Sequence, residues 1–242
     1  MKVESVVEIA TRYIEELIIT GKLRPGEQIK EDDISSRLEI SRPPVREALN
    51  CLEGEGLVIR KPRKGAFVIE MTEKDVKEIY ALKAELYAMA TATAIDLITD
   101  DQINELKMLV QEMKKIVNTE QISILNYQKL HREFHVKIME IAGNRRLLKF
   151  ASSLHKQIRR YSFQTLSFED HLFESNQFHQ KIADTIADKD KENAPKIMKE
   201  HILCAMHFLI NTPGILTDPD SYFKKNDKKP GTPVLKNIIT TH

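Results

Sequence analysis

The chain has 242 residues, of which 41% are hydrophobic and 30% charged, and its formal net charge at pH 7 is +1. This length suits one large or two modest domains, and the composition is that of an ordinary globular protein. Residues 1–70 hold 12 Lys and Arg against 13 Asp and Glu, so global basicity is excluded. A DNA-binding surface would have to be a local patch.

The sequence also gives no sign of a membrane or secreted protein. No apolar run reaches membrane-spanning length, and the N-terminus carries Lys2, Glu4 and Glu8 in place of a signal-peptide core. We therefore expect no membrane partner and a cytoplasmic location. Cys51 and Cys204 fall in helical contexts of separate predicted domains, and we expect buried thiols with neither a disulfide framework nor a thiolate metal site.

The first part of the chain has helical periodicity interrupted by turns. An amphipathic segment, Val6–Ile19, ends at Gly21, and Glu31–Leu38 predicts a second, short helix. Ser41 is placed to cap a third helix, whose first turn can hold two prolines because amides there lack intrahelical partners. The apolar positions of this third helix recur at helical spacing and should face a core: Val45, Ala48, Leu49 and Leu52.

A basic hairpin follows the third helix. Leu57–Ile59 and Ala66–Ile69 have the pattern of two short strands, and the turn between them, Arg60–Gly65, holds four cations and no anion. Such a turn suits contact with phosphates. Arg42 and Arg46 leave one face of the third helix near its N-terminus, where a helix-turn-helix meets base edges. The alternative is an ordinary helix-hairpin unit with a solvated basic turn.

A specific resemblance rests on four stretches of this region: Leu23–Glu27, Ser41–Leu49, Glu55–Val58 and Gly65–Val68. In order and spacing they resemble the winged helix-turn-helix of the GntR superfamily of bacterial transcription regulators. The resemblance implies that Arg42 and Arg46 contact the operator, while Ser41 and the wing residues hold the DNA backbone. The wing residues of this set are Arg63, Lys64 and Gly65.

The sequence departs from a favourable DNA-binding surface at Glu31–Asp33, where three carboxylates open the preceding helix. They suit a helix N-terminus electrostatically. If they face DNA, they oppose its binding.

From Thr72 onward helical patterning dominates. Thr72–Asp75 and Thr99–Gln102 have the form of capping boxes. Asn193 is the expected cap of the last helix, because Pro195 is tolerated only in a first turn. The six predicted helices cover residues 72–97, 99–117, 122–142, 145–163, 168–187 and 194–210.

The predicted fold class is therefore mainly α. A winged helix-turn-helix with a small β-hairpin wing occupies residues 1–70, and an all-α six-helix bundle occupies residues 71–212. Residues 213–242 are rich in Pro, Asp, Lys, Asn and Thr, and we expect a poorly ordered tail.

Four histidines of the helical domain suggest a site. His131 and His135 are four residues apart, so both imidazoles leave one face of one helix. His179 and His201 each lie inside a later helix, and facing helices of a bundle can bring such residues together. From spacing alone, a surface pair with two core histidines remains the alternative to a metal site.

The motifs around these histidines carry a second resemblance: His131–His135, Ala142–Leu147, Phe178–His179 and Met198–His201. They resemble the FCD domain, the ligand-sensing domain of the FadR-like GntR subfamily. The resemblance implies that His135, His179 and His201 bind a divalent metal, with His131 standing where the family commonly has Asp or Asn. The family often has arginine and glutamate on the first helix of this domain, where this chain has Lys83 and Tyr87.

The ligand set bears on the metal and on what binds to it. Imidazole-rich ligation suits zinc or nickel. Four neutral histidines leave the charge of a divalent ion uncompensated, so an open position should attract a small organic acid as effector.

The sequence thus predicts a homodimeric transcription regulator, not an enzyme, whose affinity for operator DNA responds to that acid. One alternative is a metalloenzyme with an appended nucleic-acid-binding domain, although the Glu-x-x-His pairs of di-metal bundles are missing. The other is a structural bundle whose histidines merely pack.

Overall fold

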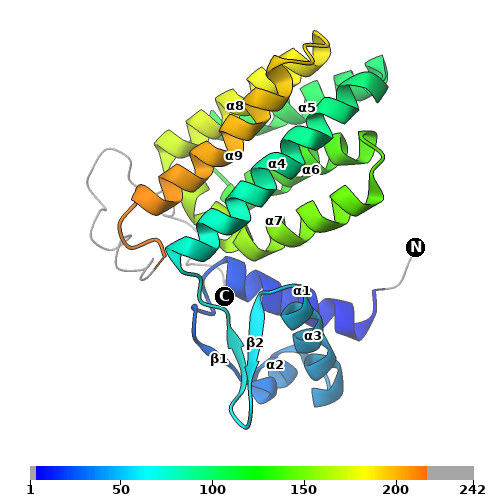
Figure 1. Ribbon diagram of the computed structural model, residues 1–242. Helices are drawn as coiled ribbons and strands as arrows, with labels where there is room; N and C mark the ends of the chain where they lie inside the picture. The colour runs from blue at the N-terminus through cyan, green and yellow to red at the C-terminus, as the bar shows by residue number, and fades with distance from the viewer. Residues whose placement is uncertain (1–3, 217–242) are drawn as a thin grey trace. The chain divides into compact units, whose positions relative to one another are not determined.

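The computed structural model describes residues 4–216. In this part of the chain there are nine helices and three short strands, and the chain divides into two compact units (Figure 1). The first runs to Thr72 and also takes in the short segment His155–Arg160; the second contains the rest from Glu73 onward.

The first unit is built on three helices, α1 (Val6–Ile19), α2 (Glu31–Leu38) and α3 (Arg42–Gly54). α1 begins with a capping box between Ser5 and Glu8. The four apolar positions predicted for α3 are all fully buried, and they join one core with the buried face of α1. Ser41 is the N-cap of α3 in extended conformation, but its side chain makes no capping hydrogen bond.

The wing is a sheet of three strands, one more than the sequence pattern indicated. β2 (Val58–Lys61) and β3 (Gly65–Val68) pair antiparallel, with Lys61 opposite Gly65. β1 (Gln28–Ile29) pairs with the other edge of β3, opposite Phe67 and Ala66. A strand of two residues has no periodicity to detect, and only the partner strand makes it a strand.

The wing turn holds its tip in a specific backbone conformation. The Lys64 amide donates to the Lys61 carbonyl at 3.0 Å, with Pro62 and Arg63 between them. Arg63 has a φ of 61° and Gly65 a φ of 89°, and a positive φ after proline is the pattern of a type II turn. Arg63 adopts a conformation that costs a residue with a Cβ some strain.

The second unit consists of six helices, as the sequence predicted: α4 (Glu73–Leu97), α5 (Asp100–Val117), α6 (Ile124–Ile141), α7 (Arg145–Leu166), α8 (Glu169–Ala187) and α9 (Asn193–Asn211). α4 packs against α9 and α6, α5 against α6 and α8, and α8 against α9. Figure 1 shows the long ribbons of α4 and α9 side by side, with opposite chain directions. Four of these helices, α4, α6, α8 and α9, surround the site described below.

The caps of this unit were partly predicted. Thr99 and Gln102 form the expected capping box of α5. Asn193 is not the cap of α9 but its first residue. Asp190 Oδ1 accepts from the backbone amides of Glu192 and Asn193, so the aspartate three residues upstream satisfies the free amides.

Two sequence expectations concern the ends and the surface. Most of the predicted tail, 213–242, lies outside the described residues, and within the described part Ile215 is fully buried. No helix between residues 4 and 216 combines the length and apolarity that a membrane crossing requires.

Candidate metal centre and DNA-binding surface

The fold brings the four predicted histidines into one cluster. His131 and His135 come from α6, His179 from α8 and His201 from α9. Each is at most 5% exposed, and one ring nitrogen of each lies within 4.8 Å of a ring nitrogen of every other. Helical spacing aligned the first two, and the packing of α8 and α9 in the bundle brought in the other two.

Hydrogen bonding fixes which nitrogen of His179 faces the cluster. Its Nδ1 lies 2.6 Å from the Ser175 carbonyl oxygen one helical turn earlier, and a carbonyl can only accept, so Nδ1 carries the proton. Nε2 is then an unprotonated donor atom, as a metal requires. It lies 3.1 Å from His135 Nε2.

That separation suits two ligands of one ion. Two nitrogens bound to the same zinc at ~2.0–2.1 Å and the tetrahedral angle lie ~3.3–3.4 Å apart. His135 Nδ1 is buried without a hydrogen-bond partner among the described residues, so this side chain is not held in place by hydrogen bonding at that nitrogen. The residues therefore fit a divalent ion.

Burial keeps the histidines in the protonation state that binds metal. Burial, followed by the neighbouring histidines, lowers the pKa of His135 well below its usual value. The pKa of His201 is lowered in the same way, with burial the largest cause, and burial lowers that of His179 to about 4. All three imidazoles are neutral at pH 7, so an ion there would keep its full positive charge.

Aromatic rings enclose the cluster. Tyr87 of α4 lies with its ring centroid 5.1 Å from that of His135, and Phe134 of α6 lies 5.1 Å from His179. Phe178 of α8 lies 5.5 Å from His201. Tyr127 donates a hydrogen bond at 3.4 Å to the Oγ of Ser175, whose carbonyl orients His179. The surroundings are apolar, which strengthens electrostatic interactions inside the site.

A buried lysine lies beside this cluster without a counter-ion. Lys83 of α4 is 4% exposed, and it forms no ion pair or hydrogen bond with the residues that the structure describes. Its Nζ lies 4.7 Å from the ring centroid of Tyr87. Burial lowers its pKa to about 7, and its charge in turn helps to lower the pKa of His135, His179 and His201.

The predicted DNA-contacting arginines lie exposed on α3, each paired with a carboxylate of α2. Arg42 Nε lies 2.5 Å from Asp32 Oδ1, and Arg46 Nε lies 2.7 Å from Glu31 Oε2. Both arginine side chains are 59% exposed. Two of the three acidic residues that seemed to oppose DNA are thus the present partners of the two arginines.

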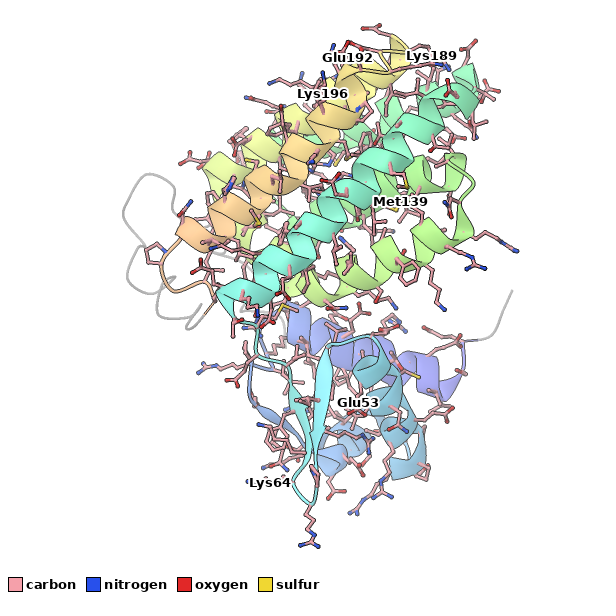
Figure 2. The ribbon with its side chains drawn as sticks, in the orientation of Figure 1. Glu53, Lys64, Met139, Lys189, Glu192 and Lys196 are labelled. Carbon is pink, nitrogen blue, oxygen red and sulfur yellow. The ribbon has the colours of Figure 1, made fainter. Side chains whose placement is uncertain are left out.

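The wing presents Arg63, Lys64 and Gly65, all exposed, and Lys64 is labelled at the end of the hairpin in Figure 2. Arg60, the first cation of the basic turn, has a different role. Its guanidinium donates to the Arg46 carbonyl at 3.1 Å and lies 3.7 Å from Glu53, so it attaches β2 to α3.

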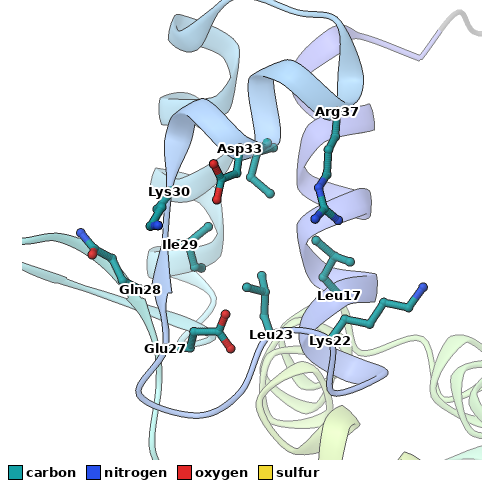
Figure 3. Close-up of a pocket in the computed structure, with 10 residues that line it drawn as sticks. Leu17, Lys22, Leu23, Glu27, Gln28, Ile29, Lys30, Asp33 and Arg37 are labelled. Atoms are coloured by element: carbon teal, nitrogen blue, oxygen red, sulfur yellow. The ribbon is translucent and has the colours of Figure 1, made fainter. Parts of the chain in front are cut away.

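A small hollow in the first unit involves none of these residues. It has a volume of about 190 Å³ and is lined by parts of α1, β1 and α2 (Figure 3). Three basic residues, Lys22, Lys30 and Arg37, line it together with the acidic Glu27 and Asp33. Because the lining carries both signs of charge, it does not indicate which class of ligand would bind there.

The cysteines differ from expectation, because Cys51 is exposed and Cys204 is only partly buried. Cys204 also belongs to a second cluster that the sequence analysis missed, with His171 and Glu174. No sequence spacing joins Cys204 to the other two, because it lies on a different helix.

Family models match most of the described chain. Residues 7–68 match the model of the gntR family of bacterial regulatory proteins, and residues 78–203 match that of the FCD domain. The first match spans α1 to the end of β3, and the second spans α4 to α9 and includes all four histidines.

Individual proteins of similar length agree with these matches. The HTH-type transcriptional regulator YdhC of Bacillus subtilis is 29% identical over 199 residues, which are 81% of this chain and 84% of that protein. The Nta operon transcriptional regulator of Aminobacter aminovorans is 29% identical over 191 residues, 77% of this chain and 86% of that one. Among solved structures, Escherichia coli McbR/YncC has a TM-score of 0.73 at 21% identity, covering 86% of this chain and 98% of its own, so the fold is shared.

Proposed function

The chain belongs to the gntR family of bacterial regulatory proteins and carries an FCD domain, and we propose that a small carboxylate bound at a divalent metal in the FCD domain controls its affinity for operator DNA. In this proposal residues 1–70 read DNA, and residues 71–212 bind metal and effector and form the homodimer. The protein acts in the cytoplasm, and the regulated operator has two related half-sites.

The observation that carries the proposal is the buried cluster of four imidazoles. Donor atoms of His131, His135, His179 and His201 lie within 4.8 Å of one another in an apolar environment. Polar groups are buried at a cost of several kcal/mol unless they are satisfied. A divalent ion would take one ring nitrogen from each of the four histidines, and nitrogen ligands favour zinc or nickel over magnesium or calcium.

Lys83 supports an anionic effector. When protonated, the buried Lys83 ammonium has aromatic rings but no anion beside it among the described residues, and next to a centre whose ion would keep its +2 charge it makes the site strongly positive. A bound metal supplies an electrophile that holds one carboxylate oxygen. Lys83 then stabilises the negative charge from the side of α4, while Tyr87 and Phe134 exclude water.

The DNA-binding surface uses the N-terminal part of α3 and the wing. Arg42 and Arg46 are exposed where a recognition helix meets base edges. Ser41, whose hydroxyl makes no capping bond, is free to contact phosphate together with Arg63, Lys64 and the backbone of Gly65. A single winged helix reads few bases, and a symmetric homodimer on two half-sites supplies the remaining specificity.

Elemental analysis tests the metal centre. The purified chain should hold a divalent ion that His135→Ala and His179→Ala proteins lose, since each substitution removes a ligand from the middle of the cluster. His207→Ala is the matched control, because His207 lies on α9 outside the cluster. Full retention of metal by both cluster variants would remove the basis of the proposal.

Binding to specific and nonspecific DNA tests the recognition helix. Arg46→Ala should cost ~1–3 kcal/mol of operator binding and leave nonspecific binding nearly unchanged, because a bidentate base contact discriminates between sequences. An unchanged operator affinity in Arg46→Ala would contradict the proposed placement of α3 on the DNA.

A further inference from the structure

A second group of metal-binding side chains lies outside the histidine cluster. His171 and Glu174 of α8 are three residues apart and share one helix face, and Cys204 comes from α9, which packs against α8. One donor atom of each residue lies within 4.8 Å of those of the other two. We propose that His171, Glu174 and Cys204 form a second metal site, which binds zinc independently of the four histidines.

The distance between two of the donors is compatible with two ligands of one ion. His171 Nδ1 lies 3.6 Å from Glu174 Oε2, which is beyond the range of a hydrogen bond. Nitrogen and oxygen ligands of one tetrahedral zinc, at ~2.0–2.2 Å from the ion, lie ~3.3–3.6 Å apart. The observed separation therefore leaves space for an ion between the two side chains.

The histidine of this group is prepared to bind a cation. His171 is 4% exposed, and its Nδ1 is buried without a hydrogen-bond partner in the described part of the chain. Its ring stacks on Phe208 of α9, with centroids 4.4 Å apart and planes 18° apart, so its orientation is fixed. Burial lowers its pKa to about 4, which leaves Nδ1 able to coordinate at neutral pH.

The chemistry of the three donors selects zinc or a similar borderline metal. Thiolate, imidazole and carboxylate are the three zinc ligands that proteins use. Burial, with Glu174 nearby, raises the pKa of the Cys204 thiol to about 12, so binding forms the S–Zn bond as the thiol proton leaves to solvent. Thiolate and carboxylate then cancel the charge of the ion, and this site, unlike the first, has no need of an added anion.

The site would join the two helices that carry His179 and His201. Its ligands come from α8 and α9, and an ion there holds these helices in one register. About one proton should be released for each ion bound at this site near pH 7, whereas the first cluster, already neutral, should release almost none.

Cobalt(II) gives a readout specific to the second site, because only this site contains sulfur. Titration of the full-length chain with Co²⁺ should produce a thiolate-to-metal charge-transfer band in the near ultraviolet. The band should vanish in Cys204→Ser and weaken in Glu174→Gln, an isosteric change at a half-exposed side chain. It should persist in Cys51→Ser, which lacks the other cysteine, and in His135→Ala, which disrupts only the first cluster.

Each outcome decides the proposal. A band that survives Cys204→Ser, or that disappears with Cys51→Ser, assigns the thiolate to Cys51 and overturns it. A band lost with His135→Ala refutes independence, and no band in the wild-type chain refutes the site. Helical circular dichroism and thermal melting of the Glu174→Gln protein keep the test valid if Cys204→Ser fails to fold. If the wild-type chain binds metal at the second site but none at the four histidines, the proposed function is contradicted and the second site is supported.

Discussion

At the scale of single residues, each arginine of the proposed recognition helix is held by a carboxylate of the helix before it. The Arg42–Asp32 pair is exposed and the Arg46–Glu31 pair is partly exposed, and ion pairs at the surface contribute ~0–1 kcal/mol. They are therefore weak enough for DNA to replace them. Their effect is to make the arginines exchange one anion for another on binding, which lowers affinity for every sequence.

Neutralising these carboxylates should strengthen DNA binding. Glu31→Gln and Asp32→Asn each remove a carboxylate that competes with DNA for one of the arginines, and we expect each to raise operator affinity by up to about 5-fold, or ~1 kcal/mol. Fluorescence anisotropy with labelled operator measures the change. Asp33→Asn is the matched control, because it removes the same charge from the same turn of α2 but pairs with neither arginine. Weaker binding by both variants would show that the carboxylates position the arginines.

We expect Lys83 to lower the folding stability of the protein while it strengthens the binding of an anion. Burial lowers its pKa from 10.5 to about 7. Between about pH 7 and 10.5 this lysine is therefore protonated in the unfolded chain and neutral in the folded chain. Stability due to this residue therefore rises with pH through that window. Below pH 7 the folded chain carries the buried charge and its full cost.

Lys83→Met should accordingly stabilise the metal-free protein by ~1–4 kcal/mol at pH 6 and much less at pH 10, in urea melts. Lys77→Met, on the exposed face of the same helix, should change stability by less than ~0.5 kcal/mol at both values. The same Lys83 variant should bind small carboxylates more weakly. If Lys83→Met instead destabilises the protein at pH 6, the charge of Lys83 is already stabilised by its surroundings in the folded chain.

At the scale of elements, the wing separates its cations by role. Arg60 is engaged with α3 through the Arg46 carbonyl and Glu53, and Arg63 and Lys64 are exposed around a turn of positive φ. The Gln28 side chain donates to the Lys64 carbonyl at 2.7 Å, which ties the turn to β1. These contacts hold the hairpin in place and leave the side chains of Arg63 and Lys64 exposed.

Lys64→Ala should weaken binding to operator and nonspecific DNA alike. Loss of one phosphate contact should reduce the slope of log K against log salt concentration by ~0.9. Lys115→Ala, an exposed lysine of α5 in the other unit, should leave the slope unchanged. An unaltered slope for Lys64→Ala would show that the tip of the wing does not contact the phosphate backbone.

Elements with strong local signals were predictable from sequence. The buried face of α3 and the capping box of α5 follow from residues close together in the chain. β1 was not predictable, because two residues become a strand only when β3 lies beside them. The cap of α9 was misplaced by one residue, because the N-cap is Glu192, while Asp190 upstream satisfies the free amides of Glu192 and Asn193.

The candidate sites show the same division. The spacing of His131 and His135 indicated a shared face, whereas their meeting with His179 and His201 depended on how α6, α8 and α9 pack. The pairing of Arg42 and Arg46 with acidic residues, the placement of Lys83 beside the histidine cluster and the gathering of Cys204 with His171 all join different elements. Such contacts are properties of the tertiary structure.

At the scale of the whole molecule, the account requires that the FCD domain and the winged helix influence each other. An effector can shift DNA binding only if it has different affinities for the DNA-competent and the incompetent arrangements. The corresponding coupling is commonly 1–3 kcal/mol, or about 5- to 150-fold in affinity. By linkage, operator DNA must change the affinity for the effector by the same factor.

The most direct measurement is operator affinity titrated with a panel of small carboxylates, using metal-loaded and chelated protein side by side. The account predicts that at least one acid changes operator affinity about 5- to 150-fold in the metal-loaded protein, and that this change is absent after chelation and in His135→Ala. An equal response in chelated protein, or no response to any acid, would contradict it.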